Sequence, residues 1–232
     1  MNIGEKDIFH VHTYRCGHAE NVSDEEYVKK ALLCGALGIW FTDHAPFPGD
    51  PFGNRMKYSE LDEYIETLFG LKQKYKDKIN IHIGLEIEFF PSFDKMGYYK
   101  ELKSKENLEM LLLGQHMAEI DSGKYTFSWD KDKLDEEEYV ALGNAQLQGI
   151  CSGYFDVVAH PDRIFRRQKA WSEDMNIMAE KIVESACHMN IPLEMNESSM
   201  KQKNHFWKEF WEKVNTAYVV HGLDAHSLNE IK

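Results

Sequence analysis

The sequence lacks any long hydrophobic run. None of its apolar stretches approaches the about 20 residues that a membrane-spanning helix needs, and the first residues contain no apolar segment of the kind found in signal peptides. These absences exclude a membrane partner and favour a cytoplasmic protein.

Cysteine is scarce and scattered. The chain has four cysteines and no C-x-x-C pair, so we expect reduced thiols rather than disulfides. They are Cys16, Cys34, Cys151 and Cys187. Cys16 lies near a histidine-rich segment, where loop packing is the role we expect for it.

Positive charge is outnumbered. Lysine and arginine total 27 against 39 aspartates and glutamates, which gives a net charge of -12. A protein that binds nucleic acid by neutralising phosphates needs a basic surface, so long nucleic acids are not expected as partners. A small phosphorylated molecule remains compatible with this charge, because local cations or metal ions can bind it.

Linkers, repeats and low-complexity tracts are also absent. Strand-like and helix-like segments alternate along the chain, which is typical of a single parallel α/β domain over residues 1–232. The expected strands are 7–12, 39–42, 80–85, 110–114, 155–159, 191–195 and 218–221. The expected helices are 23–35, 59–75, 98–102, 135–149, 172–188 and 204–215, with residues 118–133 polar and irregular.

Seven strand–helix units favour a closed or nearly closed barrel, one unit short of the eight-fold version. An open doubly wound sheet would give a similar alternation. Two helix starts carry capping signals: Ser23 is followed by Glu26 in the form of a capping box, and Ser172 precedes another helix.

Two histidines in the first strand form the start of a metal-site pattern. His10 and His12 are two residues apart, so regular alternation would place both side chains on one face. His18 follows six residues later. Paired imidazoles are common ligands of zinc, iron and manganese.

The later strands also end in residues that can bind metal. In parallel α/β barrels the carboxyl ends of the strands converge on one face, so these groups should meet. The seven ends carry His10 and His12, Asp43 and His44, Glu86, His116, His160, Asn196, and Asp224 and His226. The remaining histidines, His82, His188, His205 and His221, lie within elements and are expected to be structural.

This set exceeds what one zinc ion needs, since a catalytic zinc takes about three protein ligands. Two or three divalent ions, of zinc, iron or manganese, are therefore expected, with Glu86 as the bridging anion. A metal-bound hydroxide is a nucleophile at neutral pH, and the ions stabilise charge on a phosphoryl group. The chemistry favours metal-assisted hydrolysis of a phosphoester.

The same residues resemble the polymerase and histidinol phosphatase (PHP) family over nearly the whole chain. The resemblance implies a distorted (β/α)7 TIM-like barrel with a trinuclear metal centre. It assigns a first ion to His10, His12, Glu86 and Asp224, a second to Glu86, His116 and His160, and a third to His18, His44 and His226.

Within the family, four stretches resemble the stand-alone histidinol-phosphatases. These stretches are CGHA at 16–19, TDHAP at 42–46, GLEIE at 84–88 and HPDR at 160–163. The implied reaction is hydrolysis of L-histidinol phosphate to L-histidinol and phosphate, in histidine biosynthesis.

The sequence departs from the family at two places. After the sixth strand it reads NESSMK, where Asn-Thr-Ser-Gly and a basic residue are frequent, so Lys201 offers a point charge where an arginine would bind in two places. Leu223 also stands where a small polar residue is usual, and the segment after Asp224 is short.

Roles around the substrate follow as hypotheses. Arg163 is the leading cation for the phosphate, with Asn196 and Lys201 beside it, and Glu86 serves catalysis by bridging ions. Asp43 or His226 is expected to supply the proton for the leaving group. Glu88 and Glu119 are candidates to select the amine and imidazole of histidinol, although solvated loop charges fit both equally well.

Other readings remain open. A PHP phosphoesterase could act on another small phosphoester or on nucleotide ends. An amidohydrolase-type barrel also begins with His-x-His, but it typically uses a modified lysine after the fourth strand, where this chain has Gln115 and His116. A non-catalytic metal-binding regulatory module is a third alternative.

We predict that Arg163→Ala lowers kcat/KM for the phosphoester at least about tenfold, because charge-assisted hydrogen bonds contribute roughly 1.5–3 kcal/mol. Steady-state kinetics measure this effect. An unchanged activity together with an unchanged KM would show that Arg163 does not bind the phosphate.

Overall fold

The computed structural model describes residues 3–121, 123–126, 138–202, 206–214 and 218–232. Seven strands form one sheet in the order β1-β2-β3-β4-β7-β8-β9, and β5-β6 form a separate pair. The seven strands therefore follow sequence order once the small pair is left out, as expected for strand–helix units. Their bounds are β1 Asp7–Val11, β2 Gly38–His44, β3 Asn80–Ile87, β4 Met110–Leu113, β7 Val157–Val158, β8 Leu193–Asn196 and β9 Val219–Gly222.

The chain divides into two compact units. The first contains Met1–Glu86, Lys103–Leu111 and Gly222–Lys232, and the second contains Ile87–Leu102 and Leu112–His221. The prediction of one domain over 1–232 stays a prediction.

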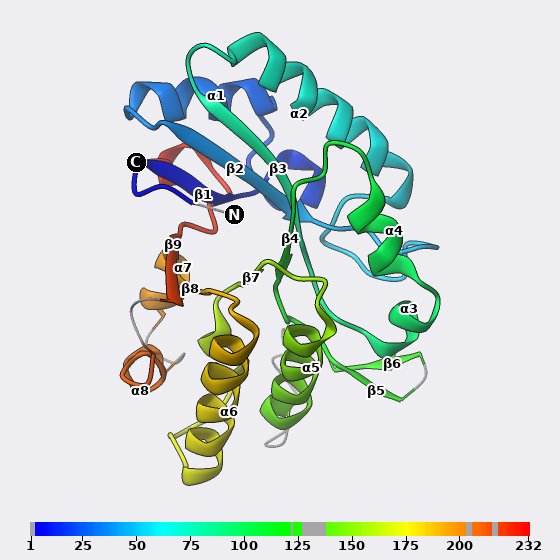
Figure 1. Ribbon diagram of the computed structural model, residues 1–232, viewed down its shortest axis with the longest axis vertical. Coiled ribbons are helices and arrows are strands. Elements are labelled where there is room, and N and C mark those ends of the chain that lie inside the picture. The colour runs from blue at the N-terminus through cyan, green and yellow to red at the C-terminus, as the bar shows by residue number, and fades with distance from the viewer. Residues whose placement is uncertain (1–2, 122, 127–137, 203–205, 215–217) are drawn as a thin grey trace. The chain divides into compact units, whose positions relative to one another are not determined.

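In the first unit, β1, β2 and β3 pair in parallel. Helices α1 (Asp24–Leu33) and α2 (Leu61–Tyr75) lie along one side of these strands (Figure 1). The strands are almost wholly buried: β2 has only its last residue, His44, partly exposed. Burial of Leu61, Tyr64, Ile65 and Leu68 shows that α2 presents its apolar face to the core, as the spacing predicted.

In the second unit, α5 (Glu138–Ser152) and α6 (Glu173–Met189) lie side by side (Figure 1). Gly149 allows α5 to approach β4 closely, because an added Cβ would lie 2.7 Å from a Leu113 methyl group and 3.2 Å from Phe89 Cβ. The strand pairs β4–β7 and β7–β8 are parallel and short.

Several predicted elements differ from the structure. Two short strands, β5 (Glu119–Asp121) and β6 (Lys124–Tyr125), pair in antiparallel fashion where irregular chain was expected. The helix expected over 204–215 is only α8 (Trp207–Trp211) in its described part; residues 203–205, including His205, and 215–217 lie outside the described residues. Two short helices were not predicted, α3 (Pro91–Lys95) and α7 (Glu197–Met200). The helix expected over 98–102 is present as α4 (Tyr98–Ser104).

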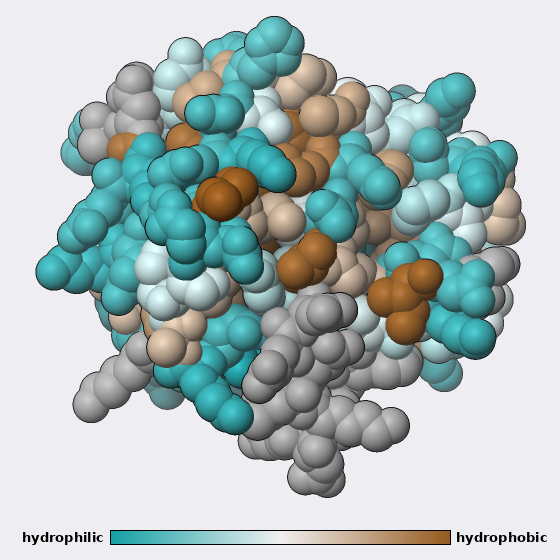
Figure 2. Space-filling view, turned by 90° about the horizontal axis from the view of Figure 1, so that it is seen from below, coloured by the Kyte–Doolittle hydropathy of each residue, from teal (hydrophilic) through white to brown (hydrophobic). Residues whose placement is uncertain are grey.

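The surface is shown from one side by the hydropathy of its residues. The face shown in Figure 2 is mostly hydrophilic, with separate hydrophobic spots. Among the described residues, no helix is both long and apolar enough to cross a membrane.

The two predicted helix caps behave differently. Ser172 accepts a hydrogen bond from the Met175 N–H at 3.2 Å. Ser23 occupies the corresponding position before α1, but its side chain makes no capping hydrogen bond. The capping box predicted there is therefore wrong, although the helix begins where it was expected.

This difference gives a matched pair of substitutions. Ser172→Ala should lower the free energy of unfolding by about 1 kcal/mol, the typical contribution of a capping side chain, while Ser23→Ala should change it by only a few tenths. Urea denaturation followed by circular dichroism measures both values. Equal losses would contradict the assignment of the cap to Ser172 alone.

Candidate metal centre

Strand β1 positions the first two histidines through a bulge. Ile8 pairs with Ile39 and Val11 with Phe41, so β1 spans three steps where β2 spans two. His10 lies in the extra step with φ 68°, and its Nε2 is 3.0 Å from that of His12. The two side chains do lie together as predicted, but a bulge re-aims His10 and the regular alternation assumed from the sequence is interrupted.

Three candidate ligands have left-handed backbone. The φ angles are 68° at His10, 28° at His160 and 56° at Asp224. Such angles cost of the order of 1–3 kcal/mol in a non-glycine residue and collect at functional sites. The surrounding fold therefore holds these side chains where relaxed backbone would not place them.

The first cluster consists of His10, His12, Glu86 and Asp224, all buried. Glu86 Oε2 lies 3.5 Å from Nε2 of both histidines. Asp224 Oδ1 lies 3.2 Å from His12 Nε2 and 3.7 Å from His10 Nε2. Two imidazole nitrogens that each face both carboxylates are a donor set that zinc, iron or manganese can use.

Asp224 reaches this cluster because its segment pairs with the free side of β1. The His12 N–H donates to the Ala225 carbonyl at 2.9 Å, and the Ala225 N–H donates to the His10 carbonyl at 3.0 Å. Val11 and Ala225 form a parallel bridge. Residues far apart in the sequence are thereby fixed beside each other.

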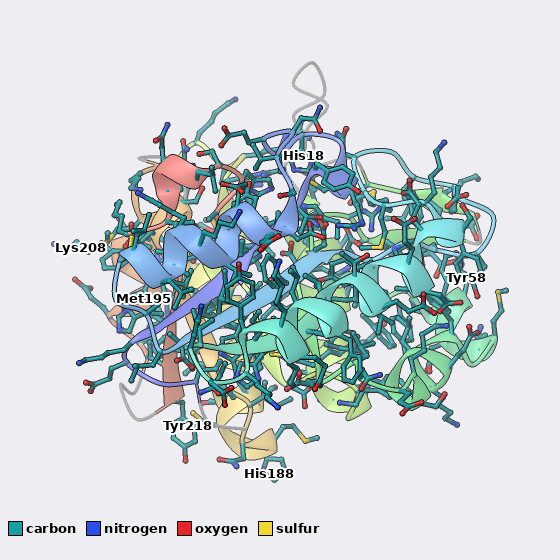
Figure 3. The ribbon with its side chains drawn as sticks, turned by 90° about the horizontal axis from the view of Figure 1, so that it is seen from above. His18, Tyr58, His188, Met195, Lys208 and Tyr218 are labelled. Carbon is teal, nitrogen blue, oxygen red and sulfur yellow. The ribbon has the colours of Figure 1, made fainter. Side chains whose placement is uncertain are left out.

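The second cluster consists of His18, His44 and His226, whose ring nitrogens converge. The centroid of the His18 ring lies 5.3 Å from that of His44, with the two rings stacked, and 4.6 Å from that of His226. His18 is labelled in Figure 3 and follows the short helical turn 14–16. Nε2 of His226 is buried and has no hydrogen-bond partner among the described residues. A buried nitrogen without such a partner, beside two other imidazoles, fits the role of a metal ligand.

The two clusters share a carboxylate. His44 Nδ1 lies 3.1 Å from Glu86 Oε2, the same oxygen that faces His10 and His12. Glu86 at the end of β3 therefore contacts both clusters, and its role as a bridging anion stays a prediction.

Cys16 joins His12 and His226 in a third convergent group, which sequence reasoning missed. Its position two residues before His18 was the available signal. Burial raises the pKa of the Cys16 thiol to about 12, and the nearby Asp43 charge adds to the effect. In the absence of a metal ion the sulfur therefore stays protonated.

The pKa values of two histidines diverge within the first unit. Burial lowers the pKa of His12, but contacts with Asp224 and Asp43 outweigh it and raise the pKa to about 9. Burial and the neighbouring His12 charge lower the pKa of His226 to about 4. A neutral His226 beside a charged His12 is the expected arrangement when no ion is present.

The second unit contains the other predicted histidines. The His116 and His160 rings lie 5.0 Å apart. His116 Nδ1 lies 3.3 Å from Oε1 of Glu88, which is buried and thus turned inward to an imidazole. Glu194, which the sequence did not single out, accepts hydrogen bonds from the His160 N–H at 3.0 Å and from Asn196 Nδ2 at 3.1 Å.

The remaining candidates lie in varied surroundings. Arg163 is half-buried in the turn Pro161–Phe165 that directly follows His160. Lys201 is exposed and 3.5 Å from Glu197. Glu119 accepts the Ser92 N–H at 2.9 Å. Asn196 caps α7 by accepting the Ser199 N–H at 2.9 Å.

Asp43 is buried with both carboxylate oxygens engaged. Oδ2 accepts from the Thr13 N–H at 3.3 Å and from the Thr13 hydroxyl. Oδ1 accepts from the His44 N–H at 3.0 Å and lies 3.5 Å from His12 Nδ1. These contacts tie Asp43 to two histidines of the clusters.

Parallel strands separated by helices, with buried clusters of imidazole and carboxylate groups at the strand ends, define an α/β metalloprotein. The model of the PHP domain matches residues 9–198. The chain therefore belongs to the PHP family, as its motifs predicted.

Two curated relatives carry a phosphatase name. The chain is 29% identical over 162 residues to the "Probable histidinol-phosphatase" of Deinococcus radiodurans, and 30% identical over 134 residues to the "Histidinol-phosphatase" of Bacillus subtilis. The matches cover 66% and 55% of this chain. They span only 59% and 50% of the length of those relatives.

Two solved structures share the fold. A candidate histidinol phosphatase from Listeria monocytogenes matches with a TM-score of 0.76 at 18% identity, covering 97% of both chains. Histidinol phosphate phosphatase from Lactococcus lactis, complexed with zinc, L-histidinol and phosphate, matches with a TM-score of 0.72 at 21% identity, covering 97% of this chain and 87% of that one. The likeness confirms the predicted fold class, a distorted seven-stranded variant of the parallel α/β barrel.

The stability of the metal-free protein should depend on pH through the two coupled histidines. The raised pKa of His12 stabilises the folded state below about pH 6.5, and this contribution is lost as pH rises towards 9. The lowered pKa of His226 has the opposite effect, since the unfolded chain binds a proton that the folded one excludes between about pH 6.5 and 4. Each contribution is of the order of 1–3 kcal/mol.

Denaturation of chelator-treated protein at pH 5, 6.5 and 9 measures this profile. Relative to the unsubstituted protein, His12→Gln should remove the fall in the free energy of unfolding between pH 6.5 and 9. His226→Gln should reduce the fall in the free energy of unfolding between pH 6.5 and 5. Parallel profiles for all three proteins would contradict the assignment.

Proposed function

We propose that this protein is a metal-dependent phosphomonoesterase that hydrolyses L-histidinol phosphate to L-histidinol and phosphate. The observation that carries the proposal is the shared oxygen of Glu86, which faces the first cluster and His44 of the second within about 3.5 Å. One carboxylate between two groups of imidazoles is suited to bridging neighbouring divalent ions.

The proposed ligands follow from the two clusters. His10, His12, Glu86 and Asp224 hold one ion, and His18, His44 and His226 hold another. His116 and His160 contribute to a further ion, with Glu88 orienting His116 through Nδ1 as carboxylates commonly do for ligating histidines. When bound, the ions supply an activated water and neutralise charge on the phosphoryl group.

On the substrate side, Arg163 binds the phosphate, because it emerges from the turn directly after His160. Lys201 and Asn196, at the two ends of α7, and Glu119 are proposed as further substrate contacts. Asp43 and His226 stay the two candidate proton donors, and neither is favoured: both Asp43 oxygens accept hydrogen bonds, and His226, whose pKa is lowered to about 4, is itself a proposed metal ligand.

The relatives support the substrate. The Bacillus subtilis and Deinococcus radiodurans proteins bear the histidinol-phosphatase name, and the Lactococcus lactis structure contains L-histidinol and phosphate together with zinc. A net charge of -12 is also compatible with a substrate that carries an amine and an imidazole.

The test is phosphate release from L-histidinol phosphate by metal-loaded protein, beside nucleotide, sugar and aryl phosphates. We expect a preference for L-histidinol phosphate of at least about a hundredfold in kcat/KM, and loss of activity on chelation. Glu86→Gln and His116→Ala should each reduce kcat by at least about a hundredfold, since removing a ligand or its partner typically costs 10–100-fold or more.

His188→Ala is the matched control, since this histidine lies exposed near the end of α6 (Figure 3) and should leave activity unchanged. Better turnover of another ester would keep the hydrolase and reject histidinol phosphate as the substrate. Metal binding without turnover of any ester would instead favour a regulatory module.

A further inference from the structure

A buried ion pair lies behind the first cluster. Arg15 Nη1 lies 2.9 Å from both carboxylate oxygens of Asp24, the first residue of α1. Both side chains are at most 4% exposed. The Arg15 guanidinium also lies over the Tyr14 and Tyr64 rings, at 4.7 and 5.7 Å from their centroids.

Such a pair contributes little net stability, because desolvation of the two charges offsets their attraction. A buried pair is better explained when it fixes the position of something else. Here the guanidinium has a further partner, since Arg15 Nη1 donates to Thr13 Oγ1 at 3.3 Å and the Arg15 N–H donates to the same oxygen at 3.4 Å.

These contacts fix the direction of the Thr13 hydroxyl. A hydroxyl has one proton to donate and two lone pairs that accept. Both donors from Arg15 occupy the accepting side, so the single proton of Thr13 points at Asp43 Oδ2. The Thr13 N–H donates to the same carboxylate oxygen at 3.3 Å.

Asp43 passes this orientation to His12. With Oδ2 held by Thr13 and Oδ1 by the His44 N–H, the carboxylate is fixed with Oδ1 3.5 Å from His12 Nδ1, an ion-pair contact and not a hydrogen bond. A carboxylate beside Nδ1 favours the proton on that nitrogen. Nε2, which faces His10, Glu86 and Asp224, is then the nitrogen that gives up its proton when a metal ion binds.

We propose that Arg15 and Asp24 are positioning residues that act through Thr13 and Asp43 to hold the His12 ring in the tautomer that binds metal through Nε2. The inference rests on the proposed metal centre, and it adds three residues, Thr13, Arg15 and Asp24, that touch neither ion nor substrate. The order of the relay is Asp24, Arg15, Thr13, Asp43 and His12.

The test is the affinity of metal-free protein for Mn²⁺ and Zn²⁺, measured by titration calorimetry, together with the melting temperature. Thr13→Val removes the hydroxyl at nearly constant shape, and Thr13→Ser retains it. We expect Thr13→Val to weaken metal binding about tenfold at the site that contains His12, which is the low end of the effect for outer partners of metal ligands. Thr13→Ser should bind metal as tightly as the unsubstituted protein does.

A second pair acts from the far end of the relay. Asp24→Asn should also weaken metal binding about tenfold. Its matched control is Glu26→Gln, in the same first turn of α1, where Glu26 forms an exposed pair with Lys29 and should leave metal affinity unchanged. In the double variant Thr13→Val/Asp24→Asn, the two losses should not add, because both act through one hydroxyl.

A purely structural role would lower the melting temperature and leave the metal affinity of Thr13→Val and Asp24→Asn unchanged, and that result overturns the inference. Full additivity of the two losses also overturns it. If Thr13→Val does not fold, Asp24→Asn and Arg15→Lys carry the same test.

Failure of the proposed function is distinguishable. Metal binding with the expected variant pattern, but without turnover of any phosphoester, rejects the phosphatase and supports the relay. Turnover of L-histidinol phosphate with unchanged metal affinity in every variant rejects the relay and supports the phosphatase.

Discussion

The main constraint on the structure is that many ionisable groups are buried close together, which is unfavourable unless their charges are compensated. His10, His12, Glu86 and Asp224 are nearly inaccessible to water. Nε2 of each of the two histidines lies 3.2–3.7 Å from an oxygen of Glu86 and of Asp224, and His44 Nδ1 lies 3.1 Å from the same Glu86 oxygen. Desolvated charges are tolerated only when they are neutralised by partners. The pKa of His12 is raised and the pKa of His226 is lowered, so a proton on His12 offsets part of the buried negative charge. Divalent cations would offset the same charge when bound.

Strand β1 is the element through which this arrangement is built. It pairs with β2 on one side and with the segment around Ala225 on the other, so its histidines are held from both directions. The bulge at His10 turns a regular strand into a ligand support. Hydrogen bonds between Asp24 and Arg15, between Arg15 and Thr13 and between Thr13 and Asp43 link this strand to residues further from the cluster.

Much of this arrangement could be predicted from the sequence, because strand ends in a parallel fold converge and their polar residues are therefore informative. The strands and main helices followed from the alternation of apolar segments, and the grouping of His10, His12 and Glu86 followed from that rule. The bulge at His10 could not be predicted, since it depends on pairing with Gly38–Phe41. Thr13, Arg15 and Glu194 were missed because their roles depend on hydrogen bonds to residues distant in sequence. The periodicity of the sequence does not reveal such contacts. The short α8 and the strand pair of β5 and β6 show tertiary context overriding local pattern.

The pairing of β1 with the segment around Ala225 has a consequence for the order of assembly. His10 and Asp224 are separated by most of the chain, so the first cluster closes a very long loop. Contacts of this kind form late in folding, after the entropy of the intervening chain has been lost. The earlier strands can fold with only part of the donor set in place, so full affinity for an ion is reached at the last step. An ion that binds only the completed cluster would then stabilise the fully folded state over partly folded ones.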